Sequence, residues 1–124
     1  MMKKAKYAAL NAQILVSDPN AQVEVPQWTT NPPVRLLWTD TCIVVGCLID
    51  ADGETEFTLG DMDEVDPGRP PAYEGKLKPP TRTLSLESVN GITVLGTRLG
   101  REETMVRIWT NHDKEPDEVI VGYE

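Results

Sequence analysis

Few side chains in this sequence are suited to acid–base or nucleophilic chemistry. One histidine, His112, stands in the polar segment NHDKEPD and is the one histidine available as a general base. The two cysteines, Cys42 and Cys47, lie in the most apolar stretch, where a thiol is expected to be buried and slow to react. The chain has neither a G-x-S-x-G motif nor a glycine-rich phosphate loop. We therefore expect no enzymatic activity and no catalytic residue, and an enzyme that uses His112 is the weakest alternative.

Metal-binding patterns are also incomplete. Two cysteines and one histidine cannot build a closed zinc site. The segment DADG resembles part of a calcium-binding loop, but the first and last ligand positions of that loop fall on Leu48 and Leu59, which excludes an EF-hand. The sequence predicts no metal site and no cofactor, although a looser carboxylate site from Asp61, Asp63 and Asp66 stays open.

The two cysteines are five residues apart, and a strand would point them to opposite faces. A disulfide between them would need a bend, for which Gly46 is available. We expect instead that both are small buried core residues with free thiols.

Charge is concentrated in one stretch. The net charge is −8, and residues 50–66 hold eight acidic residues and no lysine or arginine, so the remaining acids and bases cancel. Such a field attracts a basic protein and disfavours nucleic acid. The candidate partner-binding residues are Asp61, Asp63, Glu64 and Asp66, and the alternative is a solvated surface that keeps the protein soluble.

All three tryptophans are followed by threonine. Trp38 and Trp109 follow apolar residues and precede polar ones, so both are expected to seal strand ends of the fold. Trp28 stands in a proline-flanked segment and is the tryptophan expected to be exposed, which makes it a further candidate for partner contact.

Short alternating segments bounded by turn residues dominate the rest of the chain. Asp52-Gly53 and Asn90-Gly91 are hairpin signals, and residues 10–17 and 21–25 are predicted to form a hairpin around the SDPN turn. We predict an all-β antiparallel β-sandwich, or a flattened barrel, of about seven or eight short strands. At most one short helical turn is expected, near residues 39–45, leading into a strand at 46–50.

The length of 124 residues fits a single domain spanning 1–124. Residues 1–6 are expected to be a flexible tail, and residues 60–80, with five prolines, a long acidic loop. The N-terminal segment lacks the features of a signal peptide, and no apolar run is long enough to span a membrane. We expect a cytoplasmic protein that does not bind membranes, and the oligomeric state stays open.

Several segments, WTDTCIVVG, ADGETEF, YEGKL, RIWTN and EVIVGY, occur in an order that resembles the competence protein J and DNA-entry nuclease inhibitor family of small bacterial proteins. The resemblance covers about residues 10–123 and identifies no functional residue. It implies a non-enzymatic β-sandwich that binds and inhibits a nuclease. The leading hypothesis is an acidic protein-binding β-sandwich that inhibits a basic partner such as a nuclease. The alternative is a β-domain that binds a small ligand or a cation.

Overall fold

Ten β-strands, which together hold just under half of the described residues, form the framework of the computed structural model, which describes residues 2–27 and 35–124. Their bounds are β1 Lys3–Tyr7, β2 Gln13–Ser17, β3 Leu36–Trp38, β4 Cys42–Gly46, β5 Thr55–Asp61, β6 Tyr73–Leu77, β7 Thr83–Glu87, β8 Thr93–Arg98, β9 Thr104–Thr110 and β10 Glu118–Tyr123. One turn of α-helix, α1, spans Met62–Val65, and two 3-10 turns span Leu10–Ala12 (η1) and Asp50–Asp52 (η2).

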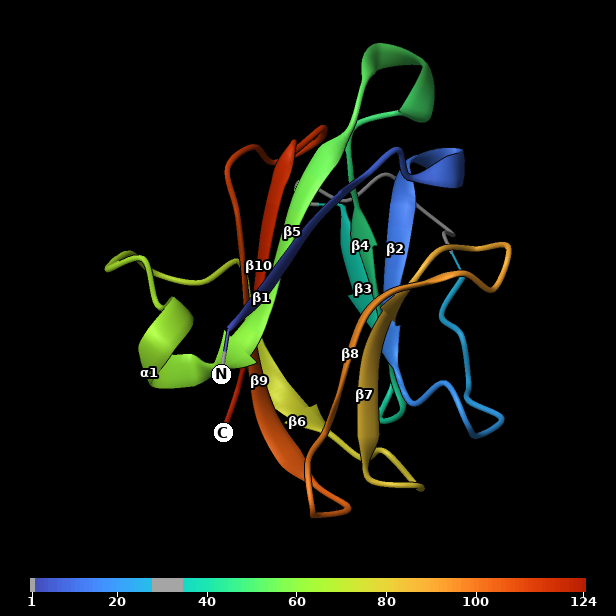
Figure 1. The fold of residues 1–124 in the computed structure, drawn as a ribbon, viewed down its shortest axis with the longest axis vertical. Coiled ribbons are helices and arrows are strands. Elements are labelled where there is room, and N and C mark those ends of the chain that lie inside the picture. The colour runs from blue at the N-terminus through green and yellow to red at the C-terminus, as the bar shows by residue number, and fades with distance from the viewer. Residues whose placement is uncertain (1, 28–34) are drawn as a thin grey trace.

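The strands form two five-stranded sheets that face each other across one core (Figure 1). The first sheet has the order β1-β5-β10-β9-β6 and the second has the order β3-β4-β2-β7-β8. Pairing is antiparallel throughout these sheets except between β10 and β5, which run parallel. The predicted antiparallel β-sandwich is therefore confirmed, with more strands than the sequence indicated.

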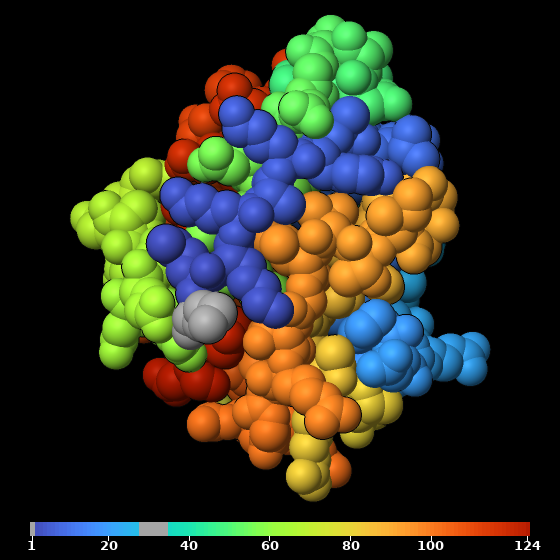
Figure 2. Space-filling model, viewed as in Figure 1, coloured from blue at the N-terminus to red at the C-terminus, as the bar shows by residue number. Residues whose placement is uncertain are grey.

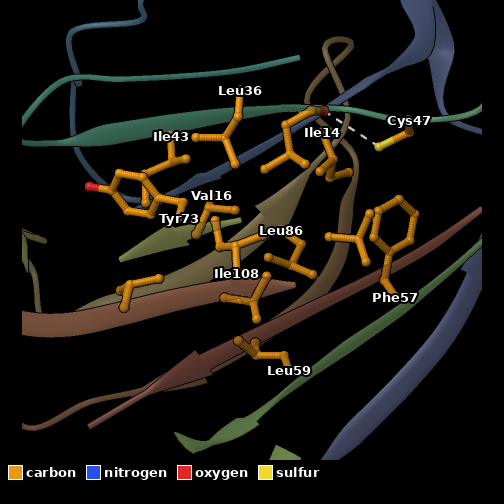
Figure 3. Packing of buried hydrophobic residues seen from close by; sticks show 14 of the residues in the cluster. Ile14, Val16, Leu36, Ile43, Cys47, Phe57, Leu59, Tyr73, Leu86 and Ile108 are labelled. Atoms are coloured by element: carbon orange, nitrogen blue, oxygen red, sulfur yellow. Dashed lines mark hydrogen bonds between the residues drawn. The ribbon is translucent and has the colours of Figure 1, made fainter. Parts of the chain in front are cut away.

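Alternation along the strands builds the core. Phe57 and Leu59 of β5 and Ile108 of β9 point inward from the first sheet, and they meet Ile14 and Leu86 from the second sheet (Figure 3). Each of these five side chains has an exposed fraction of 1% or less. Burial of a large apolar side chain contributes about 1.5–3 kcal/mol, so this layer is the main source of stability.

Residues 39–45 are not the helical turn that we predicted. Cys42–Gly46 form strand β4, which lies between β2 and β3 and is buried along its whole length. The Thr39 hydroxyl accepts a hydrogen bond from the Cys42 N–H at 3.2 Å, so it closes the tight turn between β3 and β4 rather than capping a helix. The β-branched residues at 43–45 favour the strand, and burial on both faces of the sheet decides it.

The predicted hairpin of residues 10–17 with 21–25 is also wrong. Strand β2 has β4 on one side and β7 on the other, so neither of its edges is free to pair with residues 21–25. The segment instead reaches the β3–β4 turn, where the Thr39 hydroxyl donates to the Glu24 carbonyl at 2.6 Å and the Glu24 N–H donates to the Thr41 hydroxyl at 3.0 Å. Alternation of apolar and polar residues cannot reveal that β4 and β7, rather than residues 21–25, pair with β2.

Two further expectations need correction. Lys3–Tyr7, placed largely in a flexible tail, form β1 and pair antiparallel with β5, where Lys6 stands opposite Glu56. The segment 60–80, expected to be a loop, contains the end of β5, the helical turn α1 and strand β6. Its prolines occupy the connections on either side of β6, where no ladder N–H is required.

Both cysteines are buried with free thiols, as predicted. Burial raises the pKa of each thiol to about 12, for Cys47 despite the nearby Arg35 cation. The Cys47 thiol points toward the Val45 carbonyl at 3.5 Å (Figure 3). Neither thiol is therefore a nucleophile at neutral pH.

Candidate functional site

The acidic stretch is continuous in sequence but divided in space. Strand β5 runs through the middle of the acidic stretch. Because β5 has seven residues, it separates the two ends of the stretch by roughly 20 Å. Asp50, Asp52 and Glu54 lie at the start of β5, while the acids of residues 61–66 lie at its end beside α1 (Figure 1). The candidate binding surface is therefore the second group alone.

Helix α1 and its flanks present the four predicted contact residues together. Asp61, Asp63, Glu64 and Asp66 are all exposed. The chain around α1 protrudes from one side of the molecule (Figure 2). The structure thus brings together four of the five residues that the sequence singled out, and Trp28 lies outside the described residues.

A second, smaller core holds this acidic turn in place. Met62 and Val65, one helical turn apart, are 6% exposed and pack on Trp109, which is 1% exposed. Met105 and Ile120 complete the cluster from the outer face of the sheet. A helix of four residues is unstable alone, so its shape depends on this packing. The carboxylates are therefore displayed on an ordered support.

Two backbone features fit α1 closely to the sheet. Gly122 of β10 lies under the helix, and a Cβ atom at this position would lie 3.0 Å from Val65 Cγ2 and 3.1 Å from the Met62 Cα. The Trp109 indole N–H donates to the Arg69 carbonyl at 2.8 Å, and this hydrogen bond holds the segment after α1 against the sheet. The Arg69 side chain itself points to Glu118, at 3.8 Å, and to the Thr110 carbonyl, at 3.4 Å.

Trp38 does not seal the sandwich as predicted. It ends the edge strand β3, and its side chain is 58% exposed. One side of the ring rests on Tyr73 of β6, with ring centroids 5.0 Å apart and planes inclined by 51°. Tyr73 is 8% exposed, and its hydroxyl lies over Gly75, where no side chain interferes. The phenol points away from the centre of the core (Figure 3).

Two hollows open to solvent flank Trp38. One, of about 550 Å³, is lined by Trp38, Glu24 and Asp40 among others. The other, of about 450 Å³, is lined by Trp38, Asp40, Tyr73 and Glu74 among others. Burial raises the pKa of the Tyr73 phenol, and the nearby Asp40 carboxylate raises it further. Asp40 lines the same hollow as Trp38 and Tyr73, so a negative charge stands beside the aromatic pair. The aspartate two residues after Trp38 is a signal for this site that can be seen in the sequence, whereas the exposure of the ring cannot.

His112 lies in the exposed loop before β10. Its Nδ1 accepts the N–H groups of Lys114 at 3.1 Å and Glu115 at 3.0 Å, so it stabilises the turn. Within residues 2–27 and 35–124, no three histidine, cysteine or acidic side chains are grouped as metal ligands. In the same part of the chain, no helix has the length and apolar character needed to cross a membrane.

Comparison with known proteins rests on structure. No protein-family model matches the sequence, and a sequence comparison with curated proteins gives no match. The structure is similar to the crystal structure of ComJ, an inhibitor of the DNA degrading activity of NucA, from Bacillus subtilis. The TM-score is 0.69 at 14% identity, and the match covers 99% of this chain and 97% of that chain. The resemblance noted in the sequence is thus confirmed as a likeness of fold, and the chain has the ComJ fold over almost its whole length.

Proposed function

We propose that this protein is a non-enzymatic inhibitor that binds a basic protein partner, such as a nuclease, through the acidic turn at α1. The observation that carries the proposal is the display of Asp61, Asp63, Glu64 and Asp66, all exposed, on a turn fixed by its own apolar cluster. A turn that is already ordered loses little backbone entropy on binding, so each carboxylate contributes more to a complex than it would on a mobile loop.

The likeness to ComJ supports this proposal from a separate direction. That protein inhibits a DNA-degrading enzyme and has the same fold over almost its whole length. Net charge supports it as well, because a net −8 attracts a basic partner over a Debye length and raises the association rate. Inhibition then follows when the bound protein covers the cationic surface on which a nuclease holds DNA phosphates.

The alternatives have less support in the described residues. His112 is exposed, and its Nδ1 is occupied by two backbone N–H groups, so it lacks the enclosed position of a general base. The hollows beside Trp38 are open, whereas small-molecule sites bury most of the ligand.

The decisive experiment compares two charge-matched variants. The first neutralises the acidic turn with Asp61→Asn, Asp63→Asn, Glu64→Gln and Asp66→Asn. The second makes the same change in net charge at the far end of β5 and in the loop before β10, with Asp50→Asn, Asp52→Asn, Asp113→Asn and Glu115→Gln, all at exposed positions. Each protein is added to extract of the native host, DNA degradation is followed, and captured partners are identified by pull-down.

We expect the wild type and the second variant to capture the same partner and to lower DNA degradation. The first variant should associate with that partner roughly tenfold more slowly. This difference should shrink as ionic strength rises from about 0.01 M to about 0.15 M, because the Debye length falls from ~30 Å to ~8 Å. Thermal stability of the first variant should stay the same or rise slightly, since repulsion between like charges is removed.

Equal capture and equal inhibition by both variants would show that the acidic turn is only a solvated surface. If the wild type captures a partner but does not change DNA degradation, the protein-binding role is retained and the nuclease is excluded as the partner.

A further inference from the structure

We propose that Trp38 and the carboxylates of Glu24 and Asp40 form a second contact site, which takes an arginine or lysine side chain of a protein partner. This inference rests on the proposed protein-binding function and adds a site at the edge of the sandwich. No residue of the acidic turn belongs to this second site.

The Trp38 ring is unusually exposed. Trp38 keeps 58% of its surface in solvent, although a tryptophan is usually buried in part against the core. Among the described residues, the other large apolar side chains with exposure of 40% or more are Met2, Val25, Ile49 and Ile92, so Trp38 is the aromatic member of that group. Tryptophan is also the residue most enriched in the energetic centres of protein interfaces.

The Trp38 ring also has a rigid support. Tyr73 holds one side of it at a centroid distance of 5.0 Å, and Tyr73 is itself a member of the main core. The turn after Trp38 is fixed as well, because the Thr39 N–H donates to the Cys42 carbonyl at 2.8 Å and the Thr39 hydroxyl donates to Glu24. A partner that contacts the ring therefore meets a surface that is already ordered.

Charge identifies the occupant. Glu24 and Asp40 line the same hollow as Trp38, and Asp40 also lines the hollow on the Tyr73 side. The Asp40 side chain is 83% exposed, and its ion pair with Lys78 is long, at 3.9 Å. An aromatic face next to carboxylates attracts a cation that also has an apolar stem, because the ring quadrupole and the carboxylates act on the same charge. An arginine or lysine side chain has both properties.

The surroundings also disfavour the other candidate occupants. An anionic ligand would meet Glu24, Asp40 and Glu74 around the ring, and Lys76, which also lines the hollow on the Tyr73 side, is paired with Glu103 at 3.4 Å. A second copy of this chain carries the same net charge of −8 and would be repelled at long range. The choice therefore falls on a cationic side chain of a different protein.

The test uses a defined probe, so it does not depend on the identity of the partner. A short peptide in which arginine alternates with glycine is titrated into the intact protein, and the indole N–H signals of the tryptophans and the backbone amide signals are followed by NMR, so that affinity can also be measured in a variant that lacks Trp38. The control peptide has citrulline in place of arginine, which keeps the shape of the side chain and removes its charge. Both peptides are also titrated into Trp38→Leu and into Asp40→Asn, with folding checked by thermal unfolding.

We expect the arginine peptide to shift the Trp38 indole signal in the wild type and the citrulline peptide to shift it far less. Affinity should fall by roughly 2- to 30-fold in Trp38→Leu, the range of a cation–π contact, and by a smaller factor in Asp40→Asn. Because Trp38 is exposed, both variants should fold normally.

Other outcomes would overturn the inference. Equal shifts with both peptides would mean an apolar contact without charge recognition. Shifts confined to the amides of residues 61–66, with unchanged affinity in Trp38→Leu, would leave the acidic turn as the binding surface and remove the Trp38 site. Conversely, a clear Trp38 response, combined with equal partner capture by the two charge-matched variants above, would retain this site while refuting the role of the acidic turn.

Discussion

Trp38 and Trp109 stand in almost the same local sequence, LLWTD and RIWTN, near the ends of β3 and β9. Their environments differ completely, since Trp38 is 58% exposed and Trp109 is 1% exposed. Trp109 lies on an interior strand, and α1 from another part of the chain covers it. Trp38 lies on an edge strand and has support from Tyr73.

The difference shows that the local sequence does not determine what a surface aromatic does. Trp109 lies on the outer face of its sheet, where α1 covers it and makes it part of a second core. Trp38 stands opposite the core residue Ile43, but it lies at the edge of the sandwich, where only Tyr73 supports it among the aromatic side chains of the described residues. Trp38 keeps a free ring face beside Asp40. Trp109 therefore stabilises the acidic turn, whereas Trp38 stays exposed at the sheet edge, where we propose that it contacts a partner.

The largest expected effect separates the two tryptophans by stability. Trp109→Ala removes a fully buried indole and the hydrogen bond to the Arg69 carbonyl, and it should lower the free energy of unfolding by about 3–5 kcal/mol. Trp38→Ala should cost less than about 1.5 kcal/mol, the upper range for an aromatic pair. Urea denaturation of both variants measures the difference, and equal losses of stability would contradict the different environments of the two tryptophans.

An intermediate effect is expected where α1 meets the sheet. Gly122→Ala places a methyl group 3.0–3.2 Å from Val65, Met62 and Trp109, so the helix must move outward at a cost of about 1–3 kcal/mol. Gly96→Ala in β8 is the matched control, because its nearest neighbours would lie at 3.7 Å, an ordinary contact distance. Thermal unfolding compares the two, and the same melting temperature for both would show that α1 is not closely packed.

The smallest expected effect is on the pH dependence of stability and concerns the buried carboxylate of Asp18. Asp18 is 1% exposed, unlike the acids of the turn at α1, and its carboxylate oxygens lie 2.6 and 2.7 Å from the Thr81 hydroxyl. Burial alone raises the pKa of Asp18, but hydrogen bonds from Thr81 and from the Asn20 N–H outweigh it, and the pKa lies below its ordinary value. These bonds join the turn after β2 to the segment before β7.

Because the folded-state pKa is the lower one, the stabilisation by Asp18 is present above the unfolded pKa near 3.9. It is lost as pH falls through the folded value. Asp18→Asn should cost about 1 kcal/mol at neutral pH and should flatten the fall in stability below about pH 4. Denaturation at a series of pH values tests this, with the quadruple variant of the acidic turn as control. An unchanged pH profile in Asp18→Asn would refute this role.

The sequence predicted strands correctly where apolar and polar residues alternate and a neighbouring strand has a free edge for pairing. Residues 13–17, within the strand predicted over 10–17, form β2, and Asn90-Gly91 lies in the turn that joins the paired strands β7 and β8, as its hairpin signal indicated. The prediction failed at 21–25, where both edges of β2 are already paired, and at 1–6 and 73–77, where pairing with distant strands creates β1 and β6. The hairpin predicted at Asp52-Gly53 is also wrong, because the strands before and after it, β4 and β5, belong to different sheets, and the strand predicted over 46–50 is absent because β4 ends at Gly46. Pairing between segments far apart in sequence leaves no local pattern.

The sequence alone determined the all-β class, the burial of both cysteines and the position of the excess charge, because these depend on composition and on local periodicity. Only the tertiary structure decided which acidic residues lie together and which tryptophan is exposed. Strand β5 separates one half of the acidic stretch from the other, and α1 covers Trp109 while leaving Trp38 open. Both outcomes depend on which segments pack over each sheet, and packing between distant segments is a property of the folded chain.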